Sequence, residues 1–396
     1  MTRDFDKIYR NIALISIFLI AVGFMGFGDK IVLLLLFINC LIQSVINRKL
    51  FINAELILLF AGMLFYGIFG RLEAVWMVKY TLLPALFYMF GASVPISQNR
   101  ADCNNRAKTA VIALSLGLLI ESILNALRWA PELGRYWPEF WSGRPLLATQ
   151  HVFYNLLVVA LFFYGLYRWN SHRLLNSILV LGGIWCLWFS LVTGSRSLVM
   201  IFAIVIITNI ILYFYLNRHN ETARRSLRLF ALCLLAAVIF AGALYLLNAG
   251  GIYDYLHSHT WTREGGILHN IRFQAQISAL RQIPEYPFGG SRMDLAGLGF
   301  AHNVWLDVAN RSGLIPFVLL VAYTFVTLYN LIKLIRTQTT DHDIIYLLVS
   351  SYLSLFLYYM IEPALDANIM YWALWALICG LTKGVLKNHD NMIRME

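Results

Sequence analysis

The chain has 396 residues, of which 60% are hydrophobic and 13% charged, so it has too little polar surface to fold as a water-soluble globule of this size. Its formal net charge of +10 suits a protein that lies beside anionic lipid or binds an anionic substrate. Nucleic acid is not an expected partner, because the sequence contains no basic soluble domain to hold it. The composition indicates an integral membrane protein.

Apolar runs that could cross the roughly 30 Å hydrocarbon core of a bilayer recur along the whole chain. The first run has the basic flank of a signal peptide, but no small-residue cleavage site follows, so we expect a retained helix. No linker or fixed repeat is visible, and we predict one all-α polytopic domain over residues 1–396. About twelve membrane-spanning helices are predicted, at Asn11–Gly28, Ile31–Ile46, Phe51–Gly70, Ala74–Val94, Thr109–Arg128, His151–Trp169, Ser177–Thr193, Leu198–Leu216, Leu229–Leu247, Gly313–Leu334, Ile344–Ile361 and Ile369–Leu386.

The distribution of Lys and Arg predicts the orientation, because basic residues near span ends resist translocation. An even number of spans places both termini on one side, and most basic residues fall on that side, which we take as the cytoplasm. Two long loops then lie outside. The first, Trp129–Gln150, is rich in Trp, Pro and Arg, and the second, Asn248–Ala301, is the only long polar stretch. Within the second loop, Ile271–Arg281 has apolar residues at helical spacing and predicts an amphipathic helix.

Two arginines in these outer segments are candidate ligands for an anion. Arg196 lies in Thr193-Gly-Ser-Arg-Ser197, a minimal turn between two apolar spans, where it can either snorkel to the interface or point into a cleft. Arg272 opens the amphipathic segment, and Arg is the side chain best shaped to bind phosphate or diphosphate. Further basic residues of the outer loops are either solvated surface or additional substrate contacts, namely Arg144, Arg263, Arg281 and Arg292.

His302 lies where the long polar loop meets the next helix. A neutral imidazole can accept a proton from a hydroxyl group, as a general base does, but a histidine at this position can equally be a hydrogen-bonded helix-start residue. Asn303 or Asp307 could orient the ring, and Asp307 could instead pair with Arg311 one helical turn later.

A metal site is the alternative chemistry for the same loop. His257, His259 and His269 could bind Zn²⁺, but no Cys or carboxylate completes a trusted ligand spacing. No paired carboxylates for a metal–nucleotide donor and no Gly-rich phosphate loop are visible, so we expect neither metal nor cofactor. Glu55 and Glu121 are acidic residues inside predicted spans, where ionisable groups are functional by default.

Three segments together resemble the O-antigen polymerase and ligase superfamily of bacterial inner-membrane glycosyltransferases. They are the outer turn that carries Arg196, the Arg272 helix that leads into Pro287-Phe-Gly-Gly290, and Ala301-His-Asn-Val-Trp-Leu-Asp-Val-Ala-Asn-Arg-Ser-Gly-Leu-Ile-Pro316. The last is similar to the family's His-Asn-x-x-Leu-(Asp) signature, which is followed by Gly and then Ile or Leu. The likeness at sequence level is confined to roughly residues 193–316, whereas the layout of spans agrees over nearly the whole chain.

The resemblance implies a GT-C-type membrane fold and metal-independent transfer of a glycan from an undecaprenyl-diphosphate carrier to a sugar hydroxyl. His302 would be the general base, and Arg196 and Arg272 would stabilise the departing diphosphate. Arg144, Asn303, Arg281 and Arg292 would contact substrate. The implied location is the bacterial inner membrane with the active site on the periplasmic face, and the implied partners are the lipid-linked donor, a glycan acceptor, membrane lipid and, as a candidate, a chain-length regulator.

Polymerase and ligase differ in the acceptor, which is another lipid-linked repeat unit for the first and lipid A–core for the second. We favour the polymerase because the Phe-Gly-Gly and Ala-His-Asn-x-Trp-Leu-Asp-Val segments look closer to enterobacterial polymerases. A transporter without covalent chemistry is the alternative from a different class, which inverted repeats, broken spans and charges at mid-membrane would favour. Most spans here are uninterrupted, and the functional-looking charges lie in the outer segments.

Overall fold

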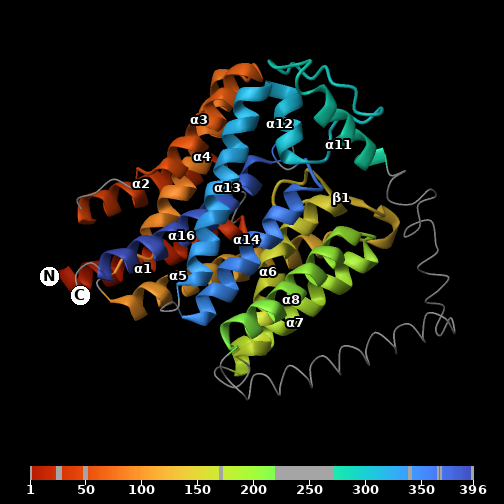
Figure 1. Cartoon of the computed structure of the whole chain (residues 1–396). Coiled ribbons are helices and arrows are strands. Elements are labelled where there is room, and N and C mark those ends of the chain that lie inside the picture. Colours follow the sequence, from red (N-terminus) through yellow and green to blue (C-terminus); the bar gives the residue numbers. More distant parts are fainter. Residues whose placement is uncertain are drawn as a thin grey trace.

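A computed structural model describes residues 2–23, 29–47, 52–97, 99–168, 173–218, 271–337, 341–363, 365 and 368–393. Within these residues the chain is helical except for one short antiparallel hairpin and the irregular segments that connect the elements, such as residues 283–303 (Figure 1). The helices are α1 Thr2–Val22, α2 Asp29–Asn47, α3 Ala54–Phe69, α4 Ala74–Ser93, α5 Arg100–Ala126, the 3-10 helix η2 Pro131–Leu133, α6 Ala148–Tyr167, α7 Arg173–Val192, α8 Arg196–Leu216, α11 Ile271–Gln282, α12 Val304–Ser312, α13 Leu314–Arg336, α14 His342–Tyr359 and α16 Ile369–Ile393, and the strands are β1 Tyr136–Pro138 and β2 Pro145–Leu147.

Among the described residues, seven helices are long and apolar enough to cross a membrane: α4, α5, α6, α7, α8, α13 and α16. The protein is therefore an all-α membrane protein. Every predicted span except Leu229–Leu247 overlaps a helix, and that segment lies outside the described residues. Two of these helices have apolar stretches shorter than the spans predicted for them, over Arg10–Val22 in α1 and Ala54–Phe69 in α3.

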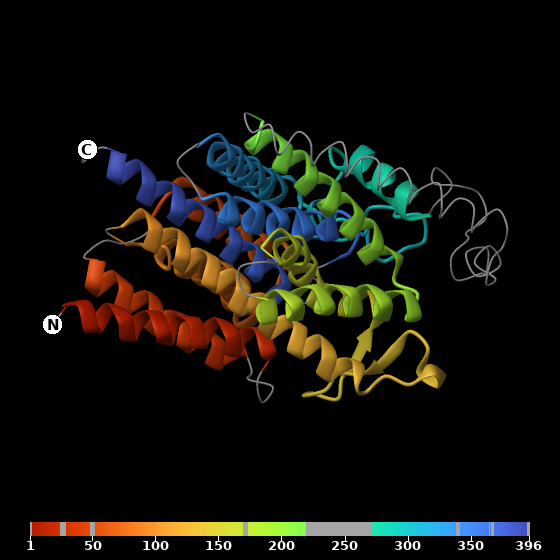
Figure 2. The same ribbon diagram turned by 90° about the horizontal axis from the view of Figure 1, so that it is seen from below.

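The two ends of the helix bundle differ in what they carry. The chain termini lie together at one end, whereas the β1–β2 hairpin, α11 and α12 lie at the other (Figure 1). The view turned by 90° shows the same separation (Figure 2). Because α7 runs back from the far end of α6 and α8 follows after a tight turn, the beginning of α8 lies at the hairpin end as well. The predicted amphipathic segment is helical, as α11.

Close helix packing holds the bundle together. At Gly380 of α16, a side chain would bring Cβ to 2.2 Å from the backbone oxygen of Tyr88 in α4, so only glycine allows this approach. Small residues at such crossings let membrane helices pack by dispersion, since lipid gives little hydrophobic driving force between helices. Elsewhere large apolar side chains such as Ile211 of α8 and Phe325 of α13 face outward, where lipid would cover them.

A buried ion pair explains Glu55, one of the two acidic residues inside predicted spans. Its carboxylate is 2.6 Å from the ammonium of Lys383 and 2.7 Å from the amide nitrogen of Asn330. These contacts join α3, α13 and α16 and satisfy the charge within the bundle. Glu55 thus makes structural contacts that link three helices.

The Pro287-Phe-Gly-Gly290 turn packs against the junction of α12 and α13. The backbone N–H of Leu314 donates to the oxygen of Pro287 at 2.8 Å, and that of Gly290 donates to the oxygen of Arg311 at 2.9 Å. Gly313 between the two helices has φ +85°, and an added Cβ would lie 2.2 Å from the Pro287 oxygen. Glycine is required there on both counts. The turn fixes the position of α11 relative to α12.

Candidate functional site

A cavity of about 480 Å³ lies at the hairpin end of the bundle. It is formed where the hairpin, the start of α6, α11, the loop before α12 and the segment after α14 meet. The described residues that line it are Arg135, Tyr136, Leu147, Thr149, Gln150, Arg272, Phe300, His302, Tyr358, Glu362 and Pro363. Two of the three residues proposed as catalytic from the sequence, Arg272 and His302, are in this set, so the fold brings them together.

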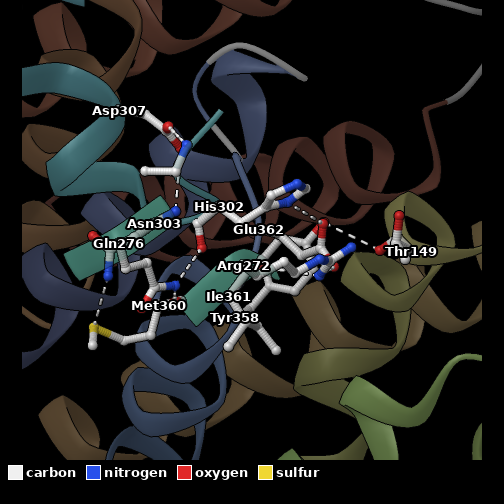
Figure 3. A network of polar contacts seen from close by, with 11 residues as sticks. Thr149, Arg272, Gln276, His302, Asn303, Asp307, Tyr358, Met360, Ile361 and Glu362 are labelled. Atoms are coloured by element: carbon white, nitrogen blue, oxygen red, sulfur yellow. Dashed lines mark hydrogen bonds and ion pairs between the residues drawn. The ribbon is translucent and has the colours of Figure 1, made fainter. Parts of the chain in front are cut away.

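A buried carboxylate stands between these two residues (Figure 3). The guanidinium Nη1 of Arg272 lies 3.1 Å from Oε1 of Glu362 and 3.3 Å from the backbone oxygen of Ile361. The Glu362 side chain is only 7% exposed, and its backbone N–H donates to the oxygen of Tyr358 at the end of α14. Arg272 supplies the cation that a buried carboxylate requires.

On the other side of the carboxylate lies His302. Its Nδ1 is 3.9 Å from Oε2 of Glu362, which is too long for a hydrogen bond. This nitrogen is buried, and no group in the described part of the chain bonds to it. The ring is 18% exposed and lines the cavity. If Nδ1–H donated to Glu362, the imidazole would be the tautomer whose Nε2 can accept a proton.

The backbone of His302 is held in an uncommon conformation. Its φ is +54°, a left-handed value that few residues other than glycine adopt. The carboxylate of Asp307 accepts from the N–H groups of Ala301 at 2.6 Å and Asn303 at 3.2 Å, on either side of the histidine. The amide of Gln276, one helical turn after Arg272, donates to the His302 oxygen at 3.3 Å. Such backbone strain persists only where the surroundings impose it, and it is common at active sites.

Asn303 is the N-cap of α12. Its side-chain oxygen accepts from the N–H of Leu306 at 3.2 Å and caps α12, and its amide nitrogen lies 3.6 Å from the Met360 sulfur. It does not line the cavity. The carboxylate of Asp307 holds the loop backbone on both sides of His302.

The remaining sequence-predicted residues lie apart from this cavity. Arg196 is the first residue of α8, at the hairpin end and half-buried, but it is not among the lining residues. Arg144 is exposed and lines a separate cavity near the tip of the hairpin. Arg281 and Arg292 are exposed and line neither. His257, His259, His269 and Arg263 lie outside the described residues.

Two charged residues of the cavity were not predicted from the sequence. Arg135 is in the Trp-rich first loop, and Glu362 lies in a short connection after α14 with no local sequence pattern. Their presence gives the cavity two guanidinium groups against one carboxylate. The net charge of these three groups is positive, so the cavity favours an anion.

Within the described residues, no group of three or more His, Cys, Asp or Glu side chains is arranged to hold a metal ion. Comparison of the chain with models of known protein families and with curated protein sequences gives no match.

Proposed function

We propose that this chain is a glycosyltransferase that moves a glycan from an undecaprenyl-diphosphate carrier to a sugar hydroxyl without a metal ion. Within that class we propose an O-antigen polymerase with a GT-C-type fold of about twelve spans. It would lie in the bacterial inner membrane, with both termini in the cytoplasm and the cavity on the periplasmic face. The observation that carries the proposal is the placement of Arg272 and His302 around one buried carboxylate in a single cavity.

The proposed reaction is a direct displacement at the anomeric carbon of the donor. The acceptor hydroxyl oxygen forms a bond to this carbon while the bond from the carbon to the diphosphate oxygen breaks. His302 takes the hydroxyl proton, and the diphosphate leaves with the bonding electron pair. Arg272 and Arg135 stabilise the negative charge that develops on the diphosphate. Stabilisation of developing charge by fixed cations is usually the largest single contribution to catalysis.

Glu362 is a positioning residue in this scheme. It orients the imidazole of His302 and stabilises the imidazolium that forms, as the carboxylate of a catalytic triad does. It also keeps the guanidinium of Arg272 in place between itself and the cavity, and a planar guanidinium can bridge a carboxylate and a phosphate. Arg196, at the same end of the bundle, remains a predicted further contact to the diphosphate or to lipid.

The location of the cavity suits a lipid-linked donor. The carrier's isoprenoid chain would lie in the bilayer, and its diphosphate would emerge at the end of the spans, where the two guanidinium groups lie. Tyr136 and Phe300 are exposed and offer aromatic surfaces on which sugar rings can pack. A chain-length regulator is the proposed protein partner.

Deletion of the gene in the source bacterium tests this proposal, with lipopolysaccharide separated on a gel. We expect loss of the polymer ladder with one repeat unit retained on lipid A–core, and restoration of the ladder by the wild-type gene but not by His302→Ala. Loss of every repeat unit from the core would instead show a ligase. An unchanged ladder would contradict both, and failure of purified protein to form any glycosidic bond would favour a transporter.

A further inference from the structure

A second cavity, of about 310 Å³, opens beside the tip of the same hairpin. It lies among the ends of α1, α5, α6 and α16, and its polar and aromatic lining includes Glu121, Glu139, Trp141, Arg144, Tyr154 and Tyr371. Its volume is at the lower end of the roughly 300–1,000 Å³ typical of small-molecule sites. None of these residues takes part in the chemistry proposed above.

The hairpin tip is fastened to the bundle by a buried acidic group. Trp141 donates its indole N–H to Glu121 at 2.7 Å, and the amide of Asn125 donates to the other oxygen of Glu121 at 2.9 Å. The side-chain oxygen of Asn125 in turn accepts from the N–H of Phe140 at 2.8 Å. These bonds fix the Trp141 ring at the cavity wall, so the cavity has a rigid aromatic surface that needs no ordering when a ligand binds.

Glu139 supplies hydrogen-bond acceptors in this cavity. Its carboxylate is half-buried, accepts a long hydrogen bond of 3.5 Å from the hydroxyl of Tyr154, and accepts another from Ser142. An ionised carboxylate has about four lone-pair positions, so two bonds leave acceptor capacity for a ligand. A group rich in hydroxyl donors is the complementary partner.

The two cavities differ in the charged groups that line them. The first has two guanidinium groups and one carboxylate, whereas the second has two carboxylates, Glu121 and Glu139, and one guanidinium, Arg144. The second cavity therefore lacks the excess of guanidinium groups that suits phosphate in the first, and a polyol that donates its hydroxyl hydrogens is the complementary ligand for its carboxylates. Arg144 lines this second cavity and not the one proposed to hold the diphosphate.

The two cavities are neighbours. The hairpin contributes Arg135 and Tyr136 to the first and its tip, residues 139–144, to the second. An aromatic wall separates them, in which Phe153 stacks on Tyr371 with ring centroids 3.9 Å apart and also contacts Tyr358 at 5.9 Å. Residues of one hairpin and of one aromatic cluster therefore line both cavities.

We propose that the second cavity binds a sugar residue of the acceptor glycan, with its ring against Trp141 and its hydroxyl groups on Glu139 and Tyr154. The assignment of this sugar to the acceptor rests on the proposed function, because only a transferase needs a second glycan beside the donor diphosphate. The cavity would hold the acceptor so that a neighbouring sugar hydroxyl reaches His302.

The test is direct binding by purified protein in detergent. The probe is the oligosaccharide that mild acid releases from lipid-linked repeat units of the source bacterium, titrated by ligand-observed NMR. We expect Trp141→Ala and Glu139→Gln to weaken its binding by about tenfold or more. The matched controls are Trp129→Ala and Glu132→Gln, in the same loop but outside the cavity, and should bind within about twofold of wild type.

Competition with inorganic pyrophosphate distinguishes the ligands of the two cavities. Because of the charge difference, pyrophosphate should not displace the oligosaccharide, and displacement would overturn the assignment. So would wild-type affinity in a monodisperse Glu139→Gln variant, which decides the matter if Trp141→Ala fails to fold. If binding depends on Trp141 and Glu139 but the protein elongates nothing, the sugar site stands and the proposed transferase activity is wrong. If both variants elongate with an unchanged acceptor KM, the transferase activity stands and the sugar site is wrong.

Discussion

Replacement of Glu362 by Gln is the most informative single change in the proposed active site. The substitution keeps the shape of the side chain and removes its charge, so it separates electrostatic support of His302 from packing. The same change releases Arg272 from its ion pair. We therefore expect the turnover rate to fall while the KM for the lipid-linked donor stays constant or decreases, because Arg272 then interacts more strongly with the diphosphate.

The distances set the size of the effect. At 3.9 Å, the separation of His302 Nδ1 from Glu362, opposite unit charges attract by about 1 kcal/mol in water and about 4 kcal/mol at an effective dielectric constant of 20. Arg272, 3.1 Å from the same carboxylate, offsets part of this field. We expect a loss of about 1.4–2.7 kcal/mol in the transition state, which is a tenfold to hundredfold fall in kcat.

The assay is elongation of lipid-linked repeat units by purified protein, with initial rates measured over a range of donor concentrations. Glu285→Gln, an exposed carboxylate beyond α11, is the matched control and should behave as wild type. If Glu362→Gln keeps the wild-type kcat, the carboxylate does not act on His302. If it instead raises donor KM and leaves kcat unchanged, Glu362 serves only to place Arg272 for ground-state binding.

Three further predictions concern Arg272, the backbone around His302 and the membrane topology. Arg272→Lys should lower elongation by more than tenfold, because Lys keeps the charge but loses the planar fork, whereas Arg281→Lys on the same helix should have no effect; equal activity would mean that a diffuse field suffices. Asp307→Asn weakens two bonds to the N–H groups that flank the proposed base, so it should cost about 1.5–3 kcal/mol of stability and reduce activity; wild-type thermal stability and activity would exclude this role. In a cysteine-free background, Glu285→Cys should react with an impermeant maleimide in spheroplasts and Asn391→Cys only after lysis; the reverse pattern would put the cavity in the cytoplasm.

The sequence predicted most of the helices, since long apolar runs have few alternatives in a membrane. It also predicted α11 from spacing, and it placed Arg272 and His302 on one side of the bundle. The structure puts both in one cavity. These features depend on local patterns, which a single sequence displays directly.

The features that were missed depend on contacts between distant parts of the chain. Glu362 contacts Arg272 only because the segment after α14 meets α11, and no sequence pattern near residue 362 predicts this contact. Arg135 and Arg144 occur in one loop but line different cavities, because a hairpin lies between them. Its strands have three residues each, too few to show periodicity, so the hairpin could not be predicted. Asn303 is the exception, because Asn before an apolar helix is a readable N-cap signal.

The measurement that tests the central claim most directly is elongation of purified lipid-linked repeat units by the purified wild-type protein and by His302→Ala, both in excess EDTA. The account predicts polymer from the wild-type protein and a rate about two to four powers of ten lower from the variant, the usual cost of losing a positioned base. Normal-length chains from His302→Ala, or wild-type activity that disappears in the chelator and returns with Mg²⁺, Mn²⁺ or Zn²⁺, would contradict it.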